Sequence, residues 1–169
     1  MLGAGPRAIA ASAAEIDSDV KDGLKSLYLS SPVAKDLSTK AKGILVLPSI
    51  AKGGFIVGGQ YGEGALIKEG KTVGYYNKAA ASFGLQAGLQ KFGYALVFMK
   101  DSALEYLDKS EGWEIGVGPS IVIVDKGTAG AFTSTTAKED IYAFFFDQAG
   151  LMAGMGLQGS KITKINKDK

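Results

Sequence analysis

The first part of the chain carries apolar residues at helical spacing. In residues 8–29 they recur every three or four positions, and most charged side chains fall on the opposite side. This pattern is typical of a helix with one buried face, so we predict a helix over 8–29. Ser31 followed by Pro32 makes a favourable N-cap and first turn. The pair predicts a second helix, which we expect to stop at Gly43.

Beyond this point the pattern changes to alternation and short apolar runs, which indicates strands. Residues 54–77 predict two strands joined by a hairpin turn at Glu69-Gly70-Lys71. Further strands are expected over residues 44–49, 140–150 and 151–165. The second half of the chain is therefore predicted to be mainly β.

Two other strand regions are less regular. Residues 80–100 form one long strand region whose alternation shifts phase near Lys91, which predicts a bulge or a bend there. Residues 112–125 predict another strand. Pro119 lies near its middle and cannot donate to a neighbouring strand, so it requires a sheet edge or a bulge.

A short helix near 101–109 is expected between these regions, with Asp101 or Ser102 as its cap. Glycine makes up 24 of the 169 residues, about 14%, against a usual share near 7%. Small residues on one side of several strands suit a tightly bent sheet. The predicted fold class is mainly β (α+β): an antiparallel, strongly curved sheet or barrel with two N-terminal helices and a short helix near 101–109.

The length suggests one domain, which we place at residues 8–169, with 1–7 as an added or flexible N-terminal segment. No stretch of 18 apolar residues occurs, so no membrane-spanning helix is expected. The start of the chain lacks the pattern of a signal peptide. We expect any leader or lipid anchor to have been removed.

The glycines Gly154, Gly156 and Gly159 form a literal G-x-G-x-x-G, the spacing that cradles a pyrophosphate at the start of a helix. The residues that follow, "SKITKI", are rich in β-branched side chains and favour a strand. The chain also ends ten residues after Gly159, which leaves no room for the rest of a dinucleotide-binding unit. We interpret these glycines as sites of close strand packing, and we expect no nucleotide ligand.

Composition narrows the chemistry. The chain has no histidine and no cysteine, which removes the commonest general base, metal ligand and thiol nucleophile. We therefore predict no enzymatic activity, no catalytic residues, no metal site and no cofactor. Arg7 is the only arginine, whereas recognition of bases and phosphates in nucleic acids favours arginine. Nucleic acid is not expected as a partner.

Lysines are the remaining candidates for binding. Lys35, Lys40, Lys42 and Lys52 fall around the second helix and the first strand. Each lysine near an anionic membrane surface contributes about 1 kcal/mol, although such charges are often only a solvated face. Trp113 is the only tryptophan, and it suits either core packing or a wedge at a membrane interface.

Long blocks of the sequence resemble the SYLF domain family. The resemblance covers roughly residues 20–165 and rests on these segments: "SSPVAKDLSTKAKGILVLPSIAKGGFIVGGQYGEGALI", "YYNKAAASFGLQAGLQKFGYALVFM", "SEGWEIGVGPSIVIV" and "GLMAGMGLQGSKITKI". It is strongest with the bacterial single-domain members of envelope or lipoprotein type. That resemblance implies a location in the bacterial periplasm or outer membrane.

The resemblance also implies a function. SYLF domains are described as lipid-binding modules, and some eukaryotic members bind actin. We therefore expect a non-enzymatic module that binds the head groups of anionic phospholipids at a membrane surface, through Lys35, Lys40, Lys42, Lys52 and Trp113. The alternative is a protein-binding, adhesive or structural module. The polar side of the first helix is acidic, so we expect this helix to dock on the sheet and not on a membrane.

Overall fold

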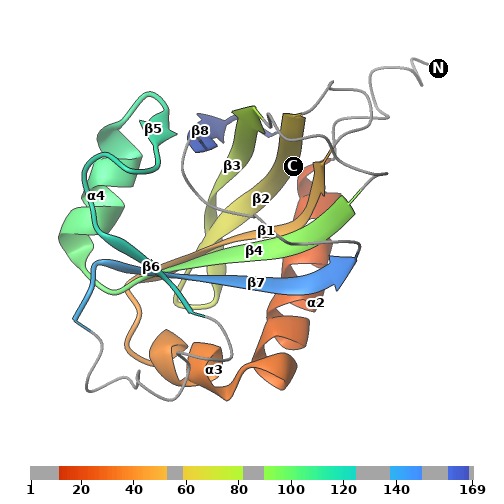
Figure 1. Ribbon diagram of the computed structural model, residues 1–169, viewed down its shortest axis with the longest axis horizontal. Helices are drawn as coiled ribbons and strands as arrows, with labels where there is room; N and C mark the ends of the chain where they lie inside the picture. Colours follow the sequence, from red (N-terminus) through yellow and green to blue (C-terminus); the bar gives the residue numbers. More distant parts are fainter. Residues whose placement is uncertain (1–11, 53–58, 82–89, 125–137, 150–159, 168–169) are drawn as a thin grey trace.

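An eight-stranded sheet forms the centre of the molecule (Figure 1). The computed structural model describes residues 12–52, 59–81, 90–124, 138–149 and 160–167. The strands are β1 Gly43–Lys52, β2 Gly59–Lys68, β3 Lys71–Ala81, β4 Gln90–Phe98, β5 Trp113–Glu114, β6 Ile121–Ile123, β7 Ile141–Ala149 and β8 Ser160–Ile165. Their order across the sheet is β5-β8-β3-β2-β1-β4-β7-β6.

The sheet curls into a half-barrel, and this confirms the predicted mainly β, strongly curved fold with two N-terminal helices and a short later one. One detail of the prediction is wrong. The sheet is mixed, because β6 pairs with β7 in parallel while the other described pairs are antiparallel. A parallel neighbour needs a long crossover, and hydrophobic alternation carries no information about strand direction.

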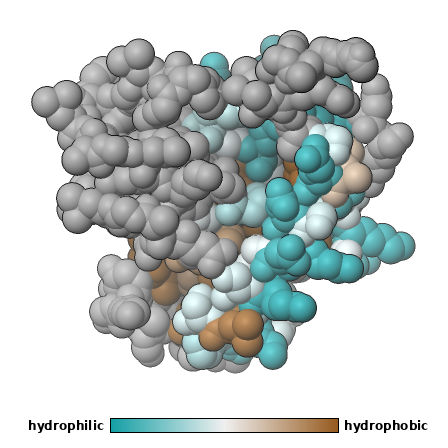
Figure 2. Space-filling view, turned by 90° about the vertical axis from the view of Figure 1, so that its right-hand side faces the viewer, coloured by the Kyte–Doolittle hydropathy of each residue, from teal (hydrophilic) through white to brown (hydrophobic). Residues whose placement is uncertain are grey.

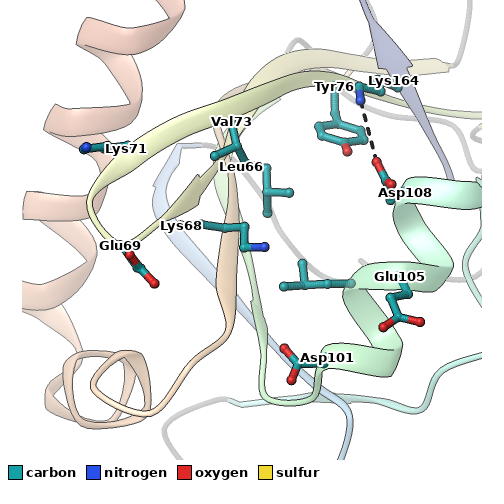
Figure 3. Close-up of a pocket in the computed structure, with 11 residues that line it drawn as sticks. Leu66, Lys68, Glu69, Lys71, Val73, Tyr76, Asp101, Glu105, Asp108 and Lys164 are labelled. Carbon is teal, nitrogen blue, oxygen red and sulfur yellow. Dashed lines mark ion pairs between the residues drawn. The ribbon is translucent and has the colours of Figure 1, made fainter.

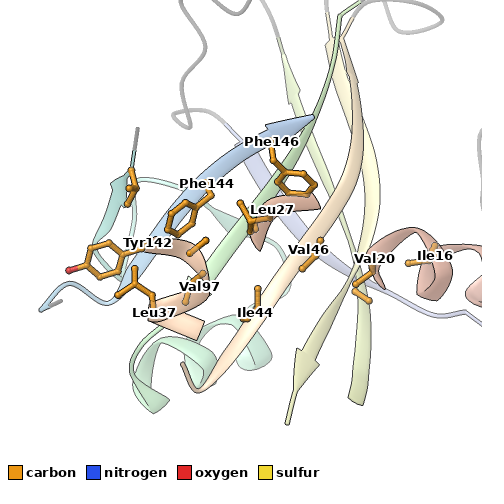
Figure 4. Close-up of a cluster of buried hydrophobic side chains, with 14 of the residues drawn as sticks. Ile16, Val20, Leu27, Leu37, Ile44, Val46, Val97, Tyr142, Phe144 and Phe146 are labelled. Carbon is orange, nitrogen blue, oxygen red and sulfur yellow. The ribbon is translucent and has the colours of Figure 1, made fainter. Parts of the chain in front are cut away.

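Side chains from the central strands are buried on both faces of the sheet. Successive residues of a strand point to opposite faces, so β1 sends Val46 to one face and Leu45 to the other. We call these the α2 face and the α4 face, after the helices that cover them. Figure 4 shows the cluster on the α2 face, where Val20 and Leu27 of the helix meet Val97 and other strand residues.

Helix α2 (Ala13–Ser30) docks on the sheet as expected. It begins five residues later than predicted, because Ser12 and Glu15 form a capping box; residues 8–11 lie outside the described part. Asp17 then ties the helix to β3: its carboxylate accepts hydrogen bonds from the hydroxyls of Tyr75 at 3.0 Å and Thr72 at 3.1 Å.

Helix α3 (Pro32–Ser38) begins as predicted. The Ser31 hydroxyl accepts a hydrogen bond from the Ala34 N–H at 3.2 Å, and Pro32 occupies the first turn. The predicted end at Gly43 is wrong, because Thr39 is the C-cap and Gly43 is already the first residue of β1. Residues 39–42 turn the chain, so no glycine cap is needed.

The β2–β3 hairpin confirms the prediction from Glu69-Gly70-Lys71. Lys68 pairs with Lys71 across a two-residue turn. Glu69 and Gly70 both have positive φ, at 52° and 78°, as a turn that matches the twist of the strands requires. The local sequence therefore determined this turn.

The region over 80–100 is not one strand. Its first residues end β3 and its last ones form β4, and these strands have different neighbours in the sheet. Residues 82–89 lie outside the described part. The irregularity expected near Lys91 is confirmed, since the register between β4 and β7 shifts between Lys91 and Gly93.

Helix α4 (Asp101–Lys109) has the predicted bounds. The predicted cap is wrong: Lys100 is the N-cap residue and makes no side-chain capping hydrogen bond. Asp101 lies instead in the first turn, where its negative charge is favourable next to the helix N-terminus.

The single strand expected over 112–125 is also wrong. This segment forms β5 and β6, which lie at the two opposite edges of the sheet. The residues between them run from one edge to the other, and Gly116 and Gly118 take positive φ values of 114° and 84°. Pro119 lies in this crossing, outside both strands. Its lack of an N–H therefore interrupts no hydrogen bond between strands.

The G-x-G-x-x-G glycines at 154, 156 and 159 lie outside the described residues. The segment that follows them is described, and it is β8 (Ser160–Ile165). This strand was predicted from "SKITKI". A dinucleotide fingerprint requires a helix at that place.

Gly64 in β2 gives a test of the close approach between β1 and β2. A Cβ at this position would overlap the carbonyl oxygen of Val46 and lie 2.8 Å from Leu47 Cα. Since backbone atoms cannot move aside without disturbing the ladder, we expect Gly64→Ala to lower the free energy of unfolding by about 3 kcal/mol in urea denaturation.

Gly74→Ala in β3 is the matched control. There the nearest atom to an added Cβ is Tyr76 Cε1 at 3.4 Å, an ordinary contact. We expect a change below about 1 kcal/mol. Equal effects of the two substitutions would contradict the role given to Gly64.

Candidate functional site

The structure brings three of the predicted lysines to one end of the sheet. Lys35 lies on α3, and Lys40 and Lys42 lie in the connection from α3 to β1. All three are exposed. The Lys42 N–H donates to the Phe98 carbonyl at 2.7 Å, which fixes this connection to the end of β4. We call this region the α3 end.

Lys52 does not join them. It is the last residue of β1, whose ten residues separate it from Lys42 by about 30 Å of extended strand. The side chain of Lys52 is outside the described part. Its place in the backbone nevertheless puts it at the opposite end of the sheet from the α3 end.

An exposed apolar side chain accompanies the lysines at the α3 end. Leu29, in the last turn of α2, is 82% exposed. The chain turns sharply after it, because Ser31 is both the C-cap of α2 and the N-cap of α3. In Figure 2, hydrophilic side chains cover much of the described surface, and apolar surface lies toward its lower end. Cations beside an apolar group are the composition of an interfacial membrane contact.

Lys100 also lies at this end but is paired. Its ammonium is 3.1 Å from the Asp140 carboxylate. Hydrogen bonds from Ser120, together with this ammonium, lower the pKa of Asp140 despite a smaller opposing effect of burial. Lys100 is therefore better explained as a link between β4, β7 and the crossing segment than as a binding residue.

Trp113 lies in the core. It is 2% exposed, and its indole N–H donates to the Val117 carbonyl at 2.9 Å. The ring packs against Phe98 and Tyr106 on the α4 face, with centroids 6.2 and 6.5 Å away. Of the two interpretations open from the sequence, core packing describes its position, because a buried ring presents no wedge to a membrane.

A buried lysine was missed from the sequence. Lys78 of β3 is fully buried, and its ammonium lies 4.9 Å from the centre of the Tyr94 ring. Burial lowers the pKa of Lys78 to about 8. The Tyr94 hydroxyl is also buried, has no hydrogen-bond partner among the described residues, and has its pKa raised by burial. Alternation with Tyr76, two residues earlier, was the signal that could have placed Lys78 on the α4 face.

A groove with a volume of about 650 Å³ lies between the β2–β3 hairpin and α4 (Figure 3). Charged side chains of both signs surround it, and Leu66 and Leu104 contribute apolar surface. Its charges were not predicted to act together, because they come from the β2–β3 hairpin, α4 and β8, which are far apart in the sequence.

A family model described as "Ysc84: Las17-binding protein actin regulator" matches residues 79–168, which is more than half of the chain. The chain belongs to the Ysc84 family. This confirms the resemblance to SYLF domains inferred from the sequence. The comparison with curated proteins finds no match.

The matched part of the Ysc84 domain runs from the end of β3 through β8. It contains Trp113 and Tyr94 but none of the predicted lysines. The family description names regulation of actin and binding to another protein, and no catalytic activity. The assignment of the lysines therefore stands on the charge and exposure of this chain alone.

The described residues contain no group of three or more acidic side chains arranged to hold a metal ion. No helix in the described ranges is long and apolar enough to cross a membrane.

Lys78 predicts an unusual pH dependence of stability. The unfolded chain keeps the Lys78 proton up to about pH 10.5, whereas the folded Ysc84 domain loses it near pH 8. Between these values the unfolded state binds more protons, so the free energy of unfolding rises with pH. The cost of the buried charge is full below pH 8 and is relieved toward pH 10.5.

We therefore expect the wild type to gain about 2–3 kcal/mol relative to Lys78→Met between about pH 7.5 and pH 10. The measurement is urea denaturation of both proteins across this range. The tyrosines with raised pKa values destabilise both proteins at high pH, so the difference between the two isolates Lys78. Parallel pH profiles would show that burial does not lower the pKa of Lys78.

Proposed function

We propose that this domain is a non-enzymatic binding module that docks its α3 end on an anionic phospholipid surface. The observation that carries the proposal is the grouping of exposed Lys35, Lys40 and Lys42 at the end of the molecule where Leu29 is 82% exposed. The lysines would attract the negative surface, and Leu29 would enter the boundary between head groups and acyl chains. Resemblance to bacterial envelope proteins favours a periplasmic or outer-membrane location.

Docking at the surface fits the packing better than carriage of a lipid inside the sheet. Buried side chains of the described residues form an apolar cluster on each face of the half-barrel. Lys78 and Tyr94 occupy the α4 face near β3 and β4, where a carried acyl chain would meet buried polar groups. The α3 end needs no such displacement to meet a membrane.

Vesicle sedimentation tests the proposal. We expect binding to phosphatidylglycerol-containing vesicles and little binding to phosphatidylcholine vesicles, with weaker binding as salt rises. Removing three cations by Lys35→Gln, Lys40→Gln and Lys42→Gln together should weaken binding by about 3 kcal/mol, or about 150-fold. Equal binding of the triple variant and the wild type would place the contact elsewhere.

The charge-matched control replaces three exposed lysines outside the α3 end, Lys21, Lys109 and Lys161, by glutamine. It should weaken binding far less, because these residues lie on other elements. Leu29→Ser completes the set: it keeps the charge and should reduce binding by about fivefold to tenfold. No effect of Leu29→Ser would mean that the contact is electrostatic only.

Binding to a protein is the second candidate function, and the family match favours it. The matching family is described as an actin regulator that binds Las17. We expect that, if this activity extends to the present chain, purified protein will co-sediment with filamentous actin. The lysine variants make the two functions separable: loss of vesicle binding with unchanged actin binding would show two surfaces, and absence of co-sedimentation would reject actin.

A further inference from the structure

The groove between the hairpin and α4 has one wall of carboxylates. Asp101, Glu105 and Asp108 follow each other at spacings of four and three residues, so they share one side of the helix. All three are exposed. Asp108 lies 3.7 Å from the Lys164 ammonium, whereas no salt bridge joins Asp101 or Glu105 to any described residue. The wall therefore presents two carboxylates that form no ion pair with a described residue.

The opposite wall does not balance it. In Figure 3, Lys68 points into the groove, while Glu69 and Lys71 point away from it. Lys164 already forms a salt bridge with Asp108. One cation thus faces two unpaired carboxylates across the groove, and the net charge of the space favours a cationic occupant.

The floor supplies apolar contacts and a hydroxyl without a partner. Leu66 and Leu104 line the groove, and Val73 at its rim is 52% exposed. Tyr76 is only 2% exposed, yet its hydroxyl is directed into the groove (Figure 3). No described residue forms a hydrogen bond with this hydroxyl. This hydroxyl opens into the groove, where it can donate a hydrogen bond to a bound partner.

We propose that the groove binds an extended peptide segment of a partner protein, with two basic side chains separated by one apolar residue. Asp101 and Glu105 are about 6 Å apart along the helix axis. Alternate residues on one side of an extended peptide have nearly the same spacing, about 6–7 Å. Two arginines in the pattern Arg-Leu-Arg therefore meet the two carboxylates in bidentate pairs.

The rest of the peptide has matching contacts. The residue between the arginines points the other way, toward the hairpin, where Val73 and Leu66 offer apolar surface. Lys68 and the Tyr76 hydroxyl can donate to carbonyl oxygens of the peptide backbone. This site is distinct from the α3 end, and it requires neither a lipid nor the lysines named for membrane docking.

The test titrates the ¹⁵N-labelled protein with Ac-Ser-Arg-Leu-Arg-Ser-NH₂ and follows backbone amide shifts by NMR. We expect saturable shifts confined to residues 66–76, 101–109 and 164, with weaker binding at higher salt. Ac-Ser-Glu-Leu-Glu-Ser-NH₂ and the version with citrulline in place of arginine should bind at least tenfold more weakly. No shifts at millimolar peptide, or equal shifts with all three peptides, would overturn the proposal.

Variants locate the contact. Asp101→Asn with Glu105→Gln should weaken binding at least tenfold, and Tyr76→Phe should weaken it severalfold while the fold is kept. The matched control is Glu111→Gln with Glu114→Gln, which changes the net charge equally at exposed positions outside the groove. Equal weakening by both pairs would mean that the peptide senses only the overall charge, and the groove would then not be the site.

Discussion

The burial of the central strands on both faces is the constraint on which the rest of this structure depends. β1 and β4 lie in the middle of the sheet, and each sends apolar side chains to two separate clusters. Each such side chain contributes about 1.5–3 kcal/mol when it leaves water, so neither face tolerates exposure. The α2–α3 pair covers one face, while α4 and the crossing segment cover the other. Hydrogen bonds from the hydroxyls of Thr72 and Tyr75 to Asp17 fix the position of α2 on the sheet.

This arrangement decides where a partner can be met. Because other elements cover both faces of the sheet, a ligand can reach the ends of the sheet and the spaces between the sheet and the covering elements. The α3 end has cations with an exposed leucine, and the groove beside α4 has carboxylates with an apolar floor. The two surfaces have opposite electrostatic character and lie on different elements.

Local signals predicted the local structure well. Ser31-Pro32 started α3, Glu69-Gly70 made the hairpin turn, and the leucine spacing of α4 set its bounds. The predictions that failed concerned pairing between residues far apart in the sequence. Alternation over 112–125 indicated a strand, but it could not tell that its two halves pair with β8 and β7 at opposite edges. For the binding surfaces, Lys35, Lys40 and Lys42 come together because they are near in sequence. Lys78 was overlooked because a lysine in a strand is usually expected to face water, and the groove joins elements that only the fold brings together.

The segment that crosses from β5 to β6 limits how far the sheet can open. Six residues link the two edges of the sheet, and the seven peptide steps reach at most roughly 25 Å. While both strands stay paired, the two edges cannot move further apart than this length. The covalent chain therefore joins two edges of the sheet that do not pair with each other. A change that widens the sheet further must detach β5 from β8 or β6 from β7. Detaching β5 would also expose Trp113, whose buried ring packs against Phe98 and Tyr106.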